Sequence, residues 1–371
     1  MTAPSDDAAS KKAQSDKPRR KNVTLTQIAQ HLGLSVATVS YVLNGKVEEN
    51  KIPERTAERV RKAAAELGYV PNEMARSLRR QRSGVIGILF SDLLSSWAHR
   101  CVVGMLRVFD EGRFIPYISV HFWDPEREQR ELQSMLGRRV EAIITVPMAE
   151  NARYYKLAEE RGVPVVFLQD SIAECPEISY AMWDARAAAR ASVLHLAESG
   201  RTKIGFVAVD QQTPFMLERL AGYREGMQEA GLEVNEDWML FDPFVPVYGA
   251  FREKLVYGSA VRALFESDAP KPEALLAMND SVGMTTLGTL KFEMGIHVPE
   301  TVAIMGMGNL PESQWLELSS SVEPIEDVGE AAARAVKALL AGKEARPLKA
   351  LTPGAEILAR GSTAAINTGV V

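Results

Sequence analysis

The first regular pattern along the chain is a pair of short helical segments with their own start and stop signals. Thr24 and Gln27 have the spacing of a capping box, and apolar residues then recur at helical intervals up to Gly33. Ser35 offers a new N-cap shortly afterwards, and a second apolar series runs to Asn44-Gly45, a typical helix terminator. Because so short a connection forces two helices to cross steeply, the pattern predicts a helix-turn-helix unit. An ordinary helical hairpin is the alternative that the spacing leaves open.

A third amphipathic segment, at residues 54–67, completes the predicted head, with Val60, Ala64 and Leu67 on its inner side. In a helix-turn-helix unit, the second helix enters the major groove with its first residues toward the base edges. We therefore expect Val39 and Val42 to pack inward. The side chains expected to face outward are Val36, Ala37, Ser40 and Tyr41.

From residue 85 onward, short apolar runs alternate with amphipathic helices, as in parallel sheets covered on both faces. The expected strands of a first lobe are 85–90, 114–120, 142–145 and 163–168. The expected elements of a second lobe are helices at 186–198, 219–230 and 249–267 and strands at 203–209, 274–278 and 301–305. The chain is then expected to return to the first lobe near residue 323, with a helix at 330–340 and a closing segment at 356–363. The predicted fold is an all-α head and a two-lobed α/β body with two doubly wound parallel sheets.

A two-lobed body of this kind offers a cleft between the lobes as its default ligand site. Ligands of parallel sheets lie beyond the carboxyl ends of the strands. Three aromatic residues, Trp97, Phe122 and Trp123, fall at or just after expected strand ends, where they are able to stack on a sugar ring or a flatter ligand. Packing in the core is the more common role of such residues.

Composition narrows the class of protein. The 371 residues are 46% hydrophobic and 25% charged, and no apolar run approaches the roughly 18 residues that a membrane span needs. Residues 1–22 lack the apolar segment of a signal peptide and predict a disordered arm, so we expect a cytoplasmic protein without a membrane partner. Cys101 and Cys175 offer neither a disulfide framework nor metal-ligand spacing, and we expect two buried thiols, no metal and no cofactor.

Charge is distributed unevenly along the chain. Residues 1–82 carry 16 Lys and Arg against 9 Asp and Glu, and residues 83–371 carry 27 against 39, so the two net charges are +7 and −12. A basic end on an acidic body suggests phosphate contacts at the head, because lysines and arginines displace counterions from the duplex. A solubilising basic tail explains the charge alone equally well.

Several longer stretches resemble the lactose/galactose repressor family of bacterial regulators. The first is VTLTQIAQHLGLSVATVSYVLNG at 23–45, followed by AELGYVPN at 65–72 and ARSL at 75–78. The further stretches, in the body, are 124–127, 218–224, 279–280 and 360–362. The resemblance covers nearly the whole chain after residue 22. It implies a DNA-binding regulator whose body has the periplasmic-binding-protein-like fold.

The residues and the resemblance together predict four parts: a disordered basic arm at 1–22, the head at 23–70, a hinge helix and linker at 71–82, and an effector-binding and dimerisation domain at 83–371. By the same resemblance Leu78 is the side chain wedged into the minor groove at the dimer centre. The residues expected to contact DNA are Thr24, Ser35, Val36, Ala37, Thr38, Ser40, Tyr41, Asn44, Asn72, Ala75 and Leu78. Those expected to face the effector are Trp97, Phe122, Trp123, Arg219, Asn279 and Asp280. From the residues alone, we would interpret 71–82 as a basic linker and Arg219 as a member of a surface ion pair. Asn279-Asp280 would be a helix N-cap with an acidic first turn.

The chain also departs from the family. Tyr41 stands where the family usually has Arg or His, so the common bidentate contact to guanine is absent and the half-site sequence is open. Gly306-Met-Gly-Asn309 and Gln169 stand where sugar-binding relatives place acids. We therefore expect a modified saccharide or another small metabolite with few hydroxyl groups. The loop at 45–54 is about three residues longer than usual and lacks the customary Ser cap.

The function predicted from these observations is a transcription regulator, expected to be a repressor, that binds a pseudo-palindromic operator as a homodimer or tetramer. A small-molecule effector in the cleft is expected to change its operator affinity. An enzyme or a secreted solute-binding protein with the same body is the alternative. No nucleophile elbow, phosphate loop or dinucleotide fingerprint favours an enzyme, and a secreted protein would need a signal peptide and no helical head.

Overall fold

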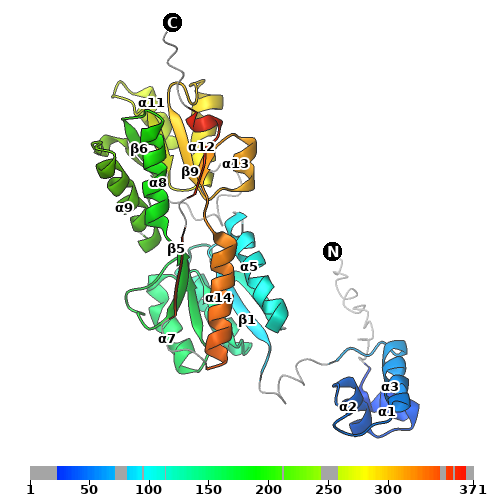
Figure 1. The fold of residues 1–371 in the computed structure, drawn as a ribbon. Coiled ribbons are helices and arrows are strands. Elements are labelled where there is room, and N and C mark those ends of the chain that lie inside the picture. Colours follow the sequence, from blue (N-terminus) through cyan, green and yellow to red (C-terminus); the bar gives the residue numbers. More distant parts are fainter. Residues whose placement is uncertain are drawn as a thin grey trace, which may run out of the picture. The chain divides into compact units, whose positions relative to one another are not determined.

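The computed structural model describes residues 23–71, 82–93, 96–112, 114–210, 213–243, 258–342, 348–353 and 356–364. The chain divides into two compact units, Met1–Arg80 and Gln81–Val371. Figure 1 shows a small helical unit and a larger unit of two sheets with helices on both faces. Within the described residues, no helix has the length and apolar character that a membrane crossing requires.

The smaller unit, hereafter the head, contains the helices α1 (Leu25–Leu32), α2 (Val36–Leu43) and α3 (Glu54–Glu66) around one apolar core. The capping box at Thr24 and the N-cap at Ser35 are both formed, and Gly33 ends α1 with a φ of +64°, which favours glycine. The predicted inner face of α3 is wrong at Leu67, which is 36% exposed. Leu67 lies beyond the last turn of α3, and the buried side chains come from Ala57, Val60, Ala63 and Ala64.

The first lobe of the larger unit has a fully parallel sheet in the order β11-β5-β4-β3-β1-β2. Its strands are β1 (Val85–Phe90), β2 (Ile115–Val120), β3 (Ala142–Thr145), β4 (Val165–Leu168), β5 (Ser179–Trp183) and β11 (Lys349–Thr352). Its helices are α5 (Ser96–Gly112), α6 (Pro125–Gly137), α7 (Ala152–Glu160) and α14 (Ile325–Leu340), with a short turn of helix η1 (Ala149–Asn151).

The second lobe has the sheet order β12-β10-β9-β8-β6-β7, parallel except for the pair β10 and β12. Its strands are β6 (Ile204–Val209), β7 (Met239–Asp242), β8 (Ala274–Ala277), β9 (Ala303–Met307), β10 (Ser319–Ser321) and β12 (Ile357–Leu358). Its helices are α8 (Ala185–Glu198), α9 (Pro214–Glu229), α11 (Ser259–Glu266), α12 (Asp280–Leu287) and α13 (Pro311–Trp315), and the short helical turns are η2 (Glu236–Trp238), η3 (Gly288–Glu293) and η4 (Gly361–Thr363). Two doubly wound sheets were predicted, and this class of fold is confirmed.

The predicted location of the closing segment is wrong. Residues 357–363 belong to the second lobe, because β12 pairs with β10 and Ser319 bonds to Ser362 and Thr363. The strand that the chain adds to the first lobe after α14 is β11, which was not predicted. The helix expected at 249–267 is found only at Ser259–Glu266, and residues 249–257 lie outside the described part.

Glycines bring helices of each lobe into backbone contact. A Cβ atom on Gly329 of α14 would lie 2.0 Å from the carbonyl oxygen of Cys101 in α5, and one on Gly104 would lie 1.9 Å from that of Glu326. A Cβ on Gly222 of α9 would lie 2.1 Å from the carbonyl oxygen of Arg186 in α8. Only glycine permits this packing, which fixes the helices that border the lobe boundary.

Candidate DNA-binding surface and effector site

The outer face of α2 is the candidate DNA-binding surface. Val36 and Tyr41 are 43% and 41% exposed, and Ala37 is exposed with them. Val39 and Val42 are buried against α1 and α3, as predicted. The helix therefore presents apolar side chains outward at the positions expected to meet base edges.

The polar residues of this surface bond mainly to one another. The hydroxyl of Ser35 accepts from the backbone N–H of Thr38 at 3.0 Å and lies 2.8 Å from the Thr38 hydroxyl. Asn44 donates from Nδ2 to the backbone oxygen of Ser40 at 2.7 Å and to its hydroxyl at 3.2 Å. Thr24 is exposed and caps α1. Ser40 and Asn44 are half-buried, so these two predicted contacts are less open than Val36 and Tyr41.

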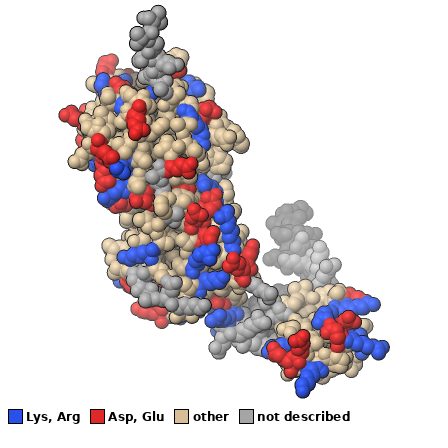
Figure 2. Space-filling model, in the orientation of Figure 1, with Lys and Arg blue, Asp and Glu red and all other residues tan. Residues whose placement is uncertain are grey.

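The described head is nearly neutral. Residues 23–71 carry six Lys and Arg against five Asp and Glu, and Figure 2 shows both signs interleaved over its visible face. The excess positive charge of residues 1–82 therefore lies in 1–22 and 72–82. Asn72, Ala75 and Leu78, three predicted DNA contacts, lie outside the described residues.

The aromatic residues predicted to face the effector lie in the first lobe. Phe122 and Trp123 follow β2 after His121, and their φ values of +52° and +59° are a conformation that bulky residues rarely adopt. Trp97 in α5 packs edge-on against Phe90, and its buried Nε1–H has no hydrogen-bond partner. Strained backbone and unpartnered polar atoms concentrate at functional sites, so this group fits a ligand-binding edge.

His121 holds that strained turn in place. Its Nδ1 accepts the backbone N–H of Trp123 at 3.1 Å, and its Nε2 lies 3.1 Å from the carbonyl oxygen of Val146 after β3. Both contacts are satisfied only when Nε2 carries the proton and Nδ1 does not. Burial lowers the pKa of His121 to about 4, which keeps the ring neutral. The ring therefore links the carboxyl ends of β2 and β3, the two strands that flank β1.

A buried carboxylate, that of Glu128 in α6, lies next to His121. It accepts hydrogen bonds from the Tyr155 hydroxyl and, at 2.7 Å, from Asn151 Nδ2, and it lies 3.9 Å from His121 Nε2. Burial raises the pKa of Glu128 to about 7, although the two hydrogen bonds oppose that shift.

Arg219 of α9 is a member of a buried ion pair. Its guanidinium bonds to Glu323, in the segment that connects β10 to α14, and the two side chains are 3% and 4% exposed. It also lies over the ring of Phe215, 4.3 Å from the centroid. The Nε–H of Arg219 and the hydroxyl of Ser321 are buried without a partner. The sequence-based alternative of a surface ion pair is wrong, because the pair is inside the protein.

Asn279 and Asp280 begin α12. The Asn279 side chain caps the helix by accepting from the backbone N–H of Val282 at 2.9 Å. Asp280 is fully buried, and its carboxylate accepts from the Leu310 N–H at 2.7 Å, the Ser313 hydroxyl at 2.6 Å and the Ser320 hydroxyl at 2.5 Å. Burial raises its pKa in spite of these bonds. Asp280 thus fixes the turn after β9 from inside the lobe.

Two carboxylates that were not predicted as site residues lie beside the positions where the chain lacks the acids of sugar-binding relatives. A Cβ on Gly308 would be 3.6 Å from Oε2 of Glu323, so Glu323 brings a carboxylate to this place from another element. Asp170, next to Gln169, is buried and accepts the backbone N–H of Phe215 at 2.9 Å. Burial raises the pKa of Asp170 to about 7. Carboxylates thus lie near both positions although neither position itself carries an acid, and no periodic pattern in the sequence points to Glu323 or Asp170.

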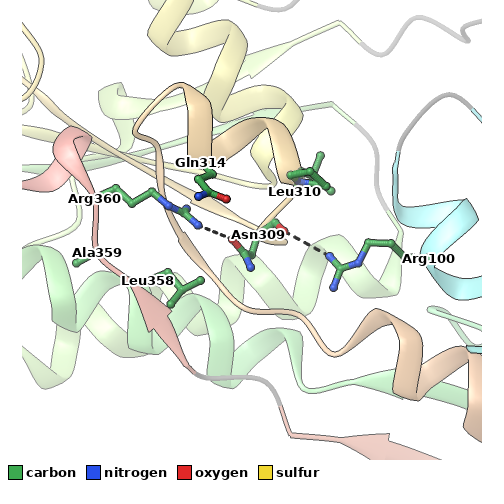
Figure 3. Close-up of a pocket in the computed structure, with 8 residues that line it drawn as sticks. Arg100, Asn309, Leu310, Gln314, Leu358, Ala359 and Arg360 are labelled. Carbon is green, nitrogen blue, oxygen red and sulfur yellow. Dashed lines mark hydrogen bonds between the residues drawn. The ribbon is translucent and has the colours of Figure 1, made fainter. Parts of the chain in front are cut away.

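Figure 3 shows a pocket at the lobe boundary beside the turn after β9. Arg100 of α5 binds Glu326 through two contacts of 2.7 and 2.8 Å and donates to the carbonyl oxygen of Gly308 at 3.1 Å. Arg360 donates to Oδ1 of Asn309 at 2.7 Å. The pocket is lined by Arg100, Asn309, Leu310, Pro311, Gln314, Leu358, Ala359 and Arg360. It includes none of the residues predicted to face the effector, but its Arg100 connects the first lobe to the turn that carries Gly308.

Comparison with known proteins gives two family matches. Residues 24–72 match bacterial regulatory proteins of the lacI family, and residues 193–363 match a periplasmic binding protein-like domain.

Curated relatives match along most of their length. The HTH-type transcriptional regulator CelR of Thermobifida fusca is 28% identical over 340 residues, 89% of this chain and 96% of the relative. Catabolite control protein A of Priestia megaterium is 27% identical over 84% of this chain and 91% of the relative.

Solved structures also match this chain over most of its length. The chain matches a CelR-cellobiose complex with a TM-score of 0.66 and 25% identity, covering 92% of this chain and all of that one. It matches the lac repressor dimer bound to operator and an anti-inducer with a TM-score of 0.75 and 21% identity, covering 93% of this chain, a likeness of fold. The relatives are named as transcription regulators, and none of those named here is an enzyme.

Proposed function

Because this chain belongs to the lacI family of bacterial regulatory proteins and is a DNA-binding transcription regulator, we propose that it binds a pseudo-palindromic operator as a homodimer and responds to a sugar or related metabolite held between its two lobes. The observation that carries this proposal is the exposed outer face of α2 on a compact three-helix head. Its place of action would be the nucleoid of the cytoplasm.

The effector site we propose is bounded by Trp97, Phe122 and Trp123 in the first lobe and by Arg219 with Glu323 near the second. The unpartnered buried donors, Nε–H of Arg219 and Nε1–H of Trp97, support it. A buried donor without a partner costs free energy, and hydroxyl groups of a ligand are suited to accept from such donors. The cellobiose bound in the CelR structure is consistent with a saccharide. Because Glu323 supplies a carboxylate, the effector need not be poor in hydroxyl groups.

Asn279 and Asp280 would act indirectly in this site. Asn279 Oδ1 and both carboxylate oxygens of Asp280 already accept hydrogen bonds within the protein, so we assign these residues to positioning the start of α12 and the turn at Gly308. Neither is proposed to bind the effector directly.

The homodimer would form through a face that joins α5, β2 and α13. Its exposed apolar side chains are Val103, Ile115, Ile118, Trp315 and Leu316, and β2 is the edge strand of the first sheet. Exposed apolar side chains and an open sheet edge favour association with a second copy. Because α5 and α13 line one pocket, the face spans both lobes.

Binding of the effector and binding of the operator would be linked through the arrangement of the two lobes. A ligand that binds one lobe arrangement better than the other changes the population of that arrangement, and with it the spacing of the two hinge segments predicted at 71–82. The direction of the response, induction or corepression, is an outcome of the test below.

The full-length protein tests the proposal in a gel shift against a library of palindromic duplexes, with cellobiose as the first effector probe. We expect enrichment of one palindrome, and release or tightening upon addition of a bound sugar. A variant lacking residues 1–82 should lose DNA binding and retain sugar binding in isothermal titration. A Trp315→Glu variant should become monomeric in sedimentation and lose operator affinity. Equal, weak binding to every duplex would overturn the proposal.

A further inference from the structure

The outer face of α2 has an unusual chemical character for a helix that reads DNA. No residue between Val36 and Leu43 carries an amide, carboxylate, ammonium or guanidinium group. The exposed residues of α2 are Val36, Ala37 and Tyr41. The face is therefore dominated by methyl groups and one aromatic ring.

The polar groups that flank this face are already engaged. The hydroxyls of Ser35 and Thr38 lie 2.8 Å apart, and the Asn44 amide donates both to the backbone and to the hydroxyl of Ser40. Asn44 is thus held at the end of α2 and would have to break two hydrogen bonds to offer its amide to an adenine. The polar groups left on the outer face are hydroxyls.

The four base pairs make different chemical demands in the major groove. Guanine is read by Arg or Lys on O6 and N7, adenine by Asn or Gln on N6 and N7, and cytosine by Asp or Glu on N4. The C5 methyl of thymine is read by apolar contact. Among these partners, α2 offers an exposed side chain for the thymine methyl and none for the bidentate pairings.

We propose that α2 selects its half-site by packing Val36, Ala37 and the ring of Tyr41 against thymine methyl groups, so that the bases it reads are A·T pairs. The proposal rests on the DNA-binding function and names the chemistry of that readout. Affinity for the phosphate backbone would come from basic residues elsewhere, because the described head has a net charge of only +1 by its six basic and five acidic residues.

The test begins with selection of operators from random duplexes by the full-length protein. Each thymine of the selected operator is then replaced by deoxyuridine, which removes the C5 methyl and keeps the base pair. We expect two or three thymines in each half-site to respond, each with about fourfold weaker binding, the loss expected for one buried methyl group. Thymines outside these positions are the internal control and should not respond.

Variants at exposed positions complete the test. Val36→Ala should remove the response at one thymine and leave the others. Tyr41→Phe should keep the response, because the ring makes the contact, whereas Tyr41→Arg should select a guanine that the natural protein does not prefer. A Lys62→Ala variant, on the outer side of α3, should keep the pattern of responding thymines.

The outcomes separate this inference from the function on which it rests. If an operator is enriched but deoxyuridine changes affinity nowhere, or the half-sites contain guanines whose selection is lost in Tyr41→Phe, the methyl readout is overturned and DNA binding stands. If no duplex is enriched, the DNA-binding function itself fails.

Discussion

Arg219 and Glu323 form an ion pair between α9 and the segment after β10, in which neither side chain is more than 4% exposed. The pair joins an element of the second lobe to a segment that leads into the first lobe. Arg219 retains a buried Nε–H without a partner. This unpartnered donor is the feature of Arg219 that supports its proposed place at the effector site.

Replacing Arg219 with alanine should destabilise the protein by about 3 to 5 kcal/mol, because it leaves a buried carboxylate without its counter-charge. Urea denaturation measures this loss. The matched control is Arg224→Ala on the same helix, which breaks the half-exposed pair with Glu236 and should cost less than about 1 kcal/mol. Equal losses in the two variants would contradict the assignment of Arg219 to the interior.

Gly329→Ala should separate α14 from α5. The added Cβ would meet the carbonyl oxygen of Cys101 at 2.0 Å, and a backbone atom has little room to move. We expect a loss of about 3 kcal/mol, seen as a lower melting temperature. Gly137→Ala, at the end of α6 in open space, is the control and should be neutral or slightly stabilising. If the Gly329→Ala variant has the same melting temperature as the natural protein, the two helices do not pack this closely.

Glu128→Gln should change how stability depends on pH. Because burial raises the pKa of Glu128 from 4.5 to about 7, the folded protein holds this proton more tightly than the unfolded chain. The natural protein therefore loses stability as the pH rises from about 4.5 to about 7, by on the order of 3 kcal/mol from this group. The glutamine variant lacks that loss, so its stability relative to the natural protein should increase through this window.

Denaturation of both proteins at pH 5 and pH 8 checks this prediction. His121 acts in the opposite direction, since its pKa is lowered from 6.5 to about 4 and its contribution is lost as the pH falls through that range. The histidine is present in both proteins, so its effect cancels in the comparison. A stability difference that does not change between the two pH values would refute the raised pKa.

Ser35 offers a test of the start of α2. Ser35→Ala removes the hydroxyl that accepts from the Thr38 N–H and should destabilise the head by about 1 kcal/mol. Ser35→Asp retains a capping oxygen but adds a negative charge where α2 begins. It should fold as well as the natural protein and bind operator more weakly, with the difference shrinking at high salt. If Ser35→Asp binds operator normally, the first turn of α2 does not approach the DNA.

The head was predicted well because its determinants are local. Thr24, Gly33 and Ser35 act within one turn of helix, so their spacing in the sequence already defines the start and end of α1 and α2. Leu67 was predicted to be buried because it continues the apolar spacing of α3, but the helix ends at Glu66 and Leu67 lies outside it.

The sequence predicted the fold class of the body but not how its last strands, β11 and β12, pair with the two sheets. Long apolar runs identified β1 and β6, whereas the serine-rich strand β10 and the two-residue strand β12 have no apolar pattern. Their position depends on hydrogen bonds between distant residues, such as Ser319 and Ser362. The same is true of Glu323, whose importance follows from the Arg219 that it meets and not from its neighbours in sequence.

Within the described residues, the chain passes between the lobes three times, and its last strand, β12, completes the second sheet after β11 has completed the first. Neither lobe is therefore a continuous piece of the gene, and a polypeptide that stops before residue 357 lacks an edge of the second sheet. During synthesis, the second sheet remains unfinished until these residues have left the ribosome. Termination before residue 357 would thus yield a product with the complete head but an incomplete second sheet.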